Sequence, residues 1–190
     1  MRRQKDTEFF IRLSGLGLRT FDINIYAFKK QRQFMKTAIF PGSFDPFTIG
    51  HYSVVKRSLT FIDHIIIAIG VNEAKKTLFS LDKRIEIINK VFEGDDRVSV
   101  KGYDSLTVDF AQEVGANIIL RGIRSIADFE YEKTIADANR RISGIDTILL
   151  FTEPQHSFIS STVLRDILKY GKDVKCFLPP NVTLDDLKEK

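Results

Sequence analysis

The chain has 190 residues, of which 43% are hydrophobic and 28% charged, and its formal net charge is +4 at pH 7. These values are typical of one soluble globular domain, and the longest apolar run, residues 65–71, is far too short to span a membrane. The single cysteine, Cys176, excludes an internal disulfide framework and favours a reducing compartment, so we expect a cytoplasmic protein.

The excess positive charge is confined to the N-terminus. Residues 1–34 hold eight Lys/Arg and three Asp/Glu, whereas the rest of the chain holds 21 basic and 22 acidic residues. A nearly neutral body does not support a general nucleic-acid surface, so we expect neither nucleic acid nor a membrane as a partner.

Residues 1–34 show neither an apolar secretory core nor a clear helical period, and their acidic residues argue against a transit peptide. We interpret this segment as a poorly ordered N-terminal extension. A start codon assigned too far upstream would explain it. The folded domain is then expected to span residues 35–190.

The first predicted unit, residues 37–51, is a short buried strand, a turn containing proline and glycine, and the start of a helix. Thr48 can cap a helix that begins near Ile49, which places His51 in the first turn, where free backbone N–H groups favour anions. The segment is neither a P-loop nor a dinucleotide fingerprint. The alternative is an ordinary strand–turn–helix in which His51 is incidental.

Further apolar strands alternate with amphipathic segments along the chain. They are strands at 64–71, 97–103, 117–120 and 146–151, and helices at 81–92, 107–114, 125–142, 160–170 and 184–189. This alternation predicts an α/β fold: one Rossmann-like, doubly wound domain with a five-stranded parallel sheet and helices on both faces. Ligands of such folds bind beyond the carboxyl ends of the strands, where the strand order reverses.

Polar groups follow several of the predicted strands. They are Ser43 and His51 after the first, Lys75 after the second, Arg121 and Arg124 after the fourth, and the hydroxyl-rich residues 157–162 with Arg165 after the fifth. Cations, hydroxyls and helix N-termini at one edge indicate a site for a ligand with more than one phosphate group. Taken singly, each group could equally be a solvated side chain or a helix cap.

Glu132 and Asn139 are seven residues apart and share one face of the predicted helix 125–142. A carboxylate and an amide there could orient a ribose, a base or a cation, or could lie at an ordinary exposed surface.

Five segments carry a family resemblance: PGSFDP (41–46), TIGH (48–51), ILRGIRS (119–125), ADFEYE (127–132) and SFISST (157–162). On these segments the chain resembles the bacterial phosphopantetheine adenylyltransferases, of the nucleotidyltransferase superfamily marked by a T/H-x-G-H signature. The segments occur in the family's order across nearly all of residues 35–190. The TIGH segment alone would indicate only a nucleotidyltransferase, whereas the two later motifs together are far more specific.

The resemblance implies transfer of AMP from ATP to 4′-phosphopantetheine, giving dephospho-coenzyme A and pyrophosphate in the penultimate step of coenzyme A synthesis. It also implies Mg²⁺ as cofactor and a homohexamer. Because the acceptor phosphate is already an anion, no side chain needs to act as a base; the enzyme must align two anions and stabilise charge on the α-phosphoryl group.

The resemblance also implies roles for individual residues. His51, Lys75 and Arg124 would be catalytic, and Ser43, Lys75, Thr107 and Arg121 would bind the acceptor, with Thr107 near the pantetheine arm. The ATP site would comprise Ser43, Phe44, His51, Gly122, Ile123, Arg124, Glu132, His156, Ser157, Phe158, Ile159, Ser160, Ser161 and Thr162. No metal ligands are predicted from the sequence.

This chain departs from the family pattern in three places. Ser43 stands where threonine is common, which keeps the hydroxyl, and Thr107 stands where a larger apolar residue is often seen. Residues 1–34 have no counterpart. Two further functions stay open: another small nucleotidyltransferase, acting on nicotinamide mononucleotide or glycerol phosphate, and a nucleotide-binding module without catalysis.

Overall fold

The computed structural model describes residues 35–71 and 76–188. The predicted N-terminal extension and Lys75 therefore lie outside the described residues. The second of the chain's two compact units, Lys36–Lys190, holds every element described below.

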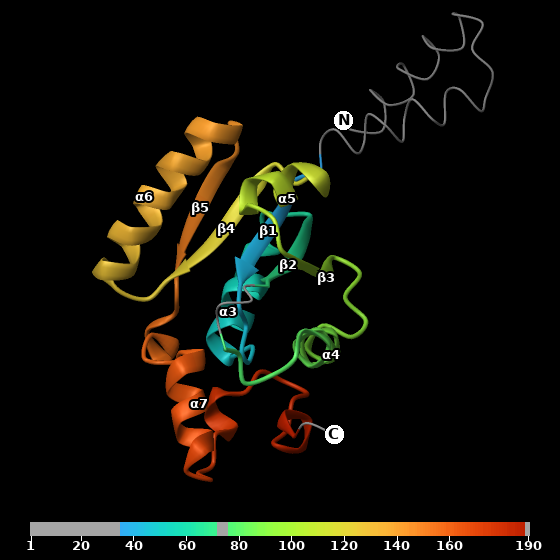
Figure 1. Ribbon diagram of the computed structural model, residues 1–190, viewed down its shortest axis with the longest axis vertical. Helices are drawn as coiled ribbons and strands as arrows, with labels where there is room; N and C mark the ends of the chain where they lie inside the picture. The colour runs from blue at the N-terminus through green and yellow to red at the C-terminus, as the bar shows by residue number, and fades with distance from the viewer. Residues whose placement is uncertain (1–34, 72–75, 189–190) are drawn as a thin grey trace, which may run out of the picture. The chain divides into compact units, whose positions relative to one another are not determined.

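The unit is built on a five-stranded, fully parallel sheet in the order β3-β2-β1-β4-β5 (Figure 1). The strands are β1 (Thr37–Gly42), β2 (His64–Gly70), β3 (Val98–Tyr103), β4 (Ile118–Ile123) and β5 (Asp146–Phe151). The chain winds outward from β1 to β3, then crosses back to β4 on the other side of β1. The strand order therefore reverses beside β1, as in a doubly wound sheet, and the predicted fold class is confirmed.

The helices cover both faces of the sheet. They are α3 (Ile49–Ser58), α4 (Leu81–Val91), α5 (Thr107–Glu113), α6 (Ile126–Ser143) and α7 (Ser161–Lys169), with short 3₁₀ turns at Pro154–His156, Lys175–Phe177 and Asp185–Leu187. Figure 1 shows α6 running along β4 and β5, on which it packs, while α5 packs against β1 and α6.

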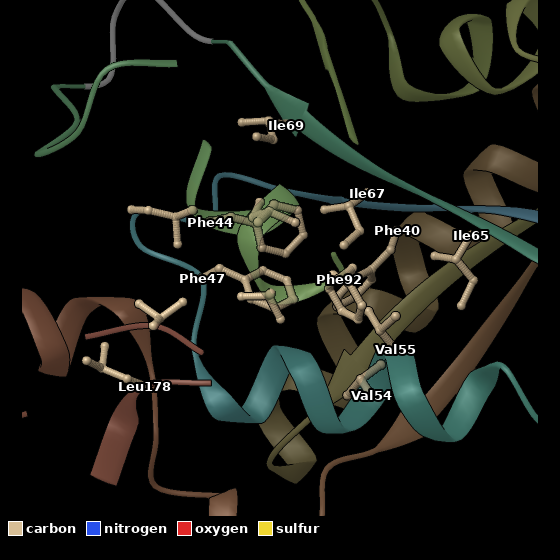
Figure 2. Close-up of a cluster of buried hydrophobic side chains, with 14 of the residues drawn as sticks. Phe40, Phe44, Phe47, Val54, Val55, Ile65, Ile67, Ile69, Phe92 and Leu178 are labelled. Carbon is tan, nitrogen blue, oxygen red and sulfur yellow. The ribbon is translucent and has the colours of Figure 1, made fainter. Parts of the chain in front are cut away.

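Alternate residues of the central strands enter two separate hydrophobic clusters. Ala38 and Phe40 of β1 join the larger cluster, which contains α3, α4 and α7, whereas Ile39 between them joins the cluster on the α5 face. In Figure 2, Phe44, Phe47 and Phe92 fill the larger cluster between the strands and α3. A strand buried on both faces needs apolar residues at every position, which explains why these strands read as continuous apolar runs.

The strand predicted at 117–120 is longer in the structure, and the difference shapes the carboxyl edge of the sheet. β1 continues through Gly42, which pairs with Ile69, and β4 continues through Ile123, which pairs with Phe151. Between each other, however, β1 and β4 pair only at Ala38 and Ile39. Beyond that point the two central strands separate, and a gap opens at their carboxyl ends.

The helix predicted at 184–189 is wrong within the described residues, where only the 3₁₀ turn Asp185–Leu187 forms. The Asp186 carboxylate accepts hydrogen bonds from the backbone N–H and hydroxyl of Thr183, at 2.7 and 2.9 Å, and pairs with Lys90. These bonds stabilise a single turn locally, in the way short acidic side chains favour turns over helix interiors.

Candidate active site

The pocket of about 290 Å³ opens where β1 and β4 separate. Its walls come from the carboxyl ends of both strands, the first turn of α3, and the start of α6 and α7. It is lined by Phe40, Pro41, Gly42, Ser43, Phe44, Thr48, Gly50, His51, Val54, Arg121, Gly122, Arg124, Asp128, Glu132, Thr152, Ile159, Ser160, Ser161, Thr162 and Arg165. The position is the one that the doubly wound topology predicts.

The loop after β1 is held in a tight fold by Phe44. The backbone of Phe44 has a φ of 45°, in the left-handed region, and its ring packs back over Gly42. A Cβ on Gly42 would lie only 2.8 Å from the ring carbon Cζ of Phe44, so this position needs glycine. The fold of the loop places Ser43 at the pocket wall.

Thr48 is the N-cap of α3 and fixes the imidazole of His51. Its backbone N–H donates to Nδ1 of His51 over 3.0 Å, while its hydroxyl accepts from the backbone N–H of His51 at 3.4 Å. The Thr48 cap that the sequence predicts is confirmed, and the reciprocal bond to His51 makes the pair a capping box. A backbone N–H can only donate, so Nδ1 is the acceptor and Nε2 carries the ring proton.

The environment of His51 keeps this ring neutral. Phe40, Phe44 and Phe47 surround it, with ring centroids 6.3, 5.1 and 5.3 Å away. Burial, with the positive charges of Arg124 and Arg121, lowers the pKa of His51 to about 3. At neutral pH the residue is therefore a neutral hydrogen-bond donor at the wall of the pocket.

Arg121 makes a two-point ion pair with Glu132. The Nε and NH2 groups of Arg121 donate to the two carboxylate oxygens of Glu132 at 2.8 and 2.5 Å, and its NH1 group donates to the carbonyl of Pro41. Glu132 is buried, so the alternative of an exposed surface does not hold for this residue. Because both oxygens of a carboxylate match the planar guanidinium, this geometry orients Arg121 firmly.

Arg124 is paired with Asp128, four residues further along. The Asp128 carboxylate accepts from the backbone N–H and Nε of Arg124 at 3.1 and 3.0 Å. Burial raises the pKa of the Asp128 carboxyl, but the hydrogen bonds and charge of Arg124 outweigh this and hold that pKa below its usual range. Asp128 stays ionised and holds Arg124 at the rim.

The start of α7 contributes the hydroxyl groups. Ser160 caps the helix by accepting from the backbone N–H of Val163, and the Ser161 hydroxyl donates to the carbonyl of Pro46 at 2.8 Å. Arg165, one turn further, donates to the Asp45 carbonyl at 2.7 Å and to the Thr162 hydroxyl at 3.2 Å. The site thus has arginines from two regions far apart in the sequence.

Most of the residues predicted for the site come together here, but some do not. Ile123 has no exposed side chain, so it can reach a ligand only through its backbone. His156, Ser157 and Phe158 do not line the pocket, and the ring of Phe158 packs against Phe177.

Thr107 also lies elsewhere, at the start of α5, where its hydroxyl is 3.0 Å from that of Tyr103. Lys75 lies outside the described residues, so its predicted role stays a prediction.

The polar pocket residues Asp128 and Thr152 are not among the site residues that the sequence predicts, whereas Arg165 is expected at this edge of the sheet. The position of Asp128 in the first turn of α6, four residues after Arg124, could have indicated it, because the helix N-terminus and the nearby cation both favour a carboxylate there. Thr152 gives no such signal in the sequence. It follows directly after β5, and it lines the pocket only because β5 is placed beside β4 in the sheet.

In residues 35–71 and 76–188, no three His, Cys, Asp or Glu side chains are grouped so that they could hold a metal ion. Over the same residues, no helix is both long and apolar enough to cross a membrane.

Comparisons with known proteins agree with this fold. A family model described as cytidylyltransferase-like matches residues 39–167. A solved bifunctional NMN adenylyltransferase/ADP ribose pyrophosphatase from Francisella tularensis has a similar fold, with a TM-score of 0.63 over 78% of this chain and 46% of that one. At 17% identity, that likeness shows the fold alone.

Curated relatives are much more similar in sequence. A phosphopantetheine adenylyltransferase from Phocaeicola vulgatus is 60% identical over 151 residues, covering 80% of this chain and all of its own. One from Bacteroides fragilis is 55% identical over 150 residues, covering 79% of this chain and again all of its own. The resemblance seen in the motifs is confirmed, and the chain belongs to the phosphopantetheine adenylyltransferase family.

Proposed function

We propose that this protein transfers AMP from ATP to 4′-phosphopantetheine, forming dephospho-coenzyme A and releasing pyrophosphate. The observation that carries the proposal is the convergence of His51, Arg121, Arg124 and Arg165 on one pocket at the switch point of the sheet. The high identity to curated phosphopantetheine adenylyltransferases supports the choice of acceptor.

The reaction is an in-line displacement at the α-phosphorus of ATP. An oxygen of the acceptor's phosphate forms a bond to that phosphorus, the bond to the bridging oxygen breaks, and pyrophosphate leaves with the electron pair. The attacking oxygen is already anionic, so no general base is required. The residues of the pocket act by alignment and by stabilising charge.

His51 is proposed to donate its Nε2 proton in a hydrogen bond to an α-phosphoryl oxygen. Its orientation is set in advance by the bond from Thr48, so little reorganisation accompanies the reaction. A neutral donor is suited to this role because it can stabilise developing charge without losing its proton to the phosphate.

The arginines of the pocket are held by carboxylates. Three arginines and two carboxylates, Asp128 and Glu132, line the pocket, which leaves it with a small net positive charge. Substrate phosphates have to compete with these carboxylates for Arg121 and Arg124. Arg121 and Lys75 are proposed to contact the acceptor phosphate, and Arg124, Ser43 and the α7 hydroxyls to contact ATP.

Mg²⁺ is proposed to arrive with ATP. The pocket's two carboxylates are both engaged by arginines, and the described residues hold no metal-binding group of three. We therefore assign no step to a protein-held metal; Mg²⁺ on the phosphate oxygens would neutralise part of their charge.

A cytoplasmic homohexamer is part of the same proposal. Apolar side chains on α6 support an assembly: Ile126, Tyr131 and Ile142 are 80%, 65% and 66% exposed. Light scattering on the purified protein would give the molar mass that tests it.

The activity is tested by measuring pyrophosphate released from ATP and Mg²⁺ with each acceptor. We expect release with 4′-phosphopantetheine and none with nicotinamide mononucleotide; CTP with glycerol phosphate is a further control. Release only with another acceptor would reject the proposal. Tight ATP binding without turnover on any acceptor would instead indicate a non-catalytic module.

A further inference from the structure

Arg84 is a buried arginine directly behind the pocket wall. It lies in the first turn of α4 and is only 4% exposed. Its NH1 group donates to the carbonyl of Ser43 at 2.8 Å, and its Nε donates to the carbonyl of Ser80 at 3.2 Å. Ser43 lines the pocket, whereas Arg84 does not. The guanidinium therefore lies one residue behind the surface that faces the ligand.

Among the described residues, no carboxylate pairs closely with the charge of Arg84. Each of the pocket arginines Arg121, Arg124 and Arg165 has a carboxylate oxygen within 4.0 Å. Within residues 35–71 and 76–188, Arg84 has none at that distance, and Asp45 is the acid that acts on it from further away.

The carboxylate of Asp45 is itself committed elsewhere. It accepts from the backbone N–H groups of Leu78 and Phe79 at 2.8 and 2.9 Å and lies 3.6 Å from Arg165. Asp45 is only 3% exposed, so this network ties the loop after β1 to the segment before α4 and to α7. It leaves the charge of Arg84 only partly compensated.

Burying a cation without a paired anion is costly, and carbonyl dipoles offset only part of that cost. A bound polyphosphate would supply the missing negative charge, because Ser43 separates Arg84 from the pocket by a single residue. Protein rather than water would fill the intervening space, so the attraction would be less screened than at an exposed site. Arg121 and Arg124 would have to break an ion pair with a carboxylate before they could interact with phosphate, whereas Arg84 would not.

We propose that Arg84 is a positioning residue for the phosphates of ATP: it fixes the backbone of Ser43 and places an only partly compensated positive charge behind it. This inference rests on the proposed function for the identity of the ligand. It assigns a role to a residue of α4, outside all the motifs that carry the family resemblance.

The test compares R84K, which keeps the charge, with R84M and R84Q, which remove it; R84Q also keeps a donor for the Ser43 carbonyl. Calorimetry on the full chain would measure binding of a non-hydrolysable ATP analogue with Mg²⁺. R97M is the matched control, because Arg97 is an exposed arginine at the amino end of β3 and its loss changes the net charge equally.

We expect R84M and R84Q to weaken analogue binding by about tenfold or more, and R84K and R97M to change it less than threefold. The KM for ATP should rise in the neutral variants while the KM for 4′-phosphopantetheine stays within about twofold. Thermal unfolding without nucleotide would confirm that each variant is folded.

Two results would overturn the proposal. One is unchanged analogue binding in a folded neutral variant; the other is an equal loss in R84K, which would mean that shape rather than charge matters. The binding measurement needs no acceptor, so a wild-type protein inactive with 4′-phosphopantetheine would count against the proposed function and not against this role of Arg84.

Discussion

The backbone N–H of Thr48 and the Nδ1 atom of His51 are 3.0 Å apart, and this one bond determines which ring nitrogen of His51 can face a substrate. Because Nδ1 must accept, the proton is on Nε2, and a protonated ring would lose the bond from Thr48. The state of His51 is thus set by the helix cap next to it. Four predictions follow from this bond and from the other contacts of the pocket and core.

The rate of the chemical step should not depend on titration of His51 near neutral pH. Burial, aided by Arg124 and Arg121, lowers the pKa of His51 to about 3, so the ring stays neutral from pH 5 to 8. We expect kcat, measured by pyrophosphate release with saturating substrates, to show no inflection near the ordinary histidine value of about 6.5. An inflection there that is absent in a His51 variant would contradict the assignment.

The H51A variant should lower kcat by about 100-fold or more, the loss expected when one oriented donor to developing charge is removed. H51N or H51Q, which retain an amide donor, should recover part of the rate. H64A is the control, because His64 lies at the amino end of β2, opposite the pocket. If H51A keeps kcat and raises only KM, His51 binds substrate without stabilising the transition state.

Replacing Glu132 by Gln should weaken stability. The change removes the charge that pairs with a half-buried Arg121, and we expect the free energy of unfolding to fall by about 1–3 kcal/mol. Denaturant unfolding measures this. D137N, which breaks the exposed pair with Lys133 on the same helix, should change stability by less than about 0.5 kcal/mol. Equal changes in the free energy of unfolding in the two variants would show that the Arg121–Glu132 pair stabilises the protein no more than an exposed ion pair does.

Deleting residues 1–34 should leave the activity intact. Among the described residues, both hydrophobic clusters are built from residues between Ala38 and Leu187, and this is the basis for the expectation. We expect kcat, KM and the Tm of residues 35–190 to match those of the full chain. A large fall in rate or Tm would show that the extension packs on the domain.

Much of the fold could be predicted because its signals are local. The alternation of buried strands and amphipathic helices indicated the parallel sheet, and Thr48 was identified as the cap that places His51 in the first turn of α3. The length of β4 could not be predicted from local sequence signals. Arg121 and Gly122 look like loop residues in the sequence, and only pairing with β5 shows that they belong to a strand.

The site was harder to predict than the fold because its decisive contacts join distant parts of the chain. Glu132 looked equally suited to an exposed surface, and nothing local shows that it pairs with Arg121 across the β4–α6 turn. The sequence gives no sign of the role of Arg84, because its hydrogen-bond acceptors are the backbone carbonyls of Ser43 and Ser80. Carbonyl acceptors are present at every residue, so such a contact leaves no trace in the sequence.

Because β1 and β4 separate early, ligand binding can change the hydrogen bonding of the sheet's own backbone. Past Ile39 the carbonyl of Pro41 receives its hydrogen bond from the Arg121 side chain rather than from a neighbouring strand. If an incoming phosphate displaces the Arg121 guanidinium, the Pro41 carbonyl loses its hydrogen-bond donor. Water or a donor group of the ligand then has to replace it. Occupancy of the cleft and the hydrogen bonding of the Pro41 carbonyl at the end of β1 are therefore linked through the Arg121 side chain.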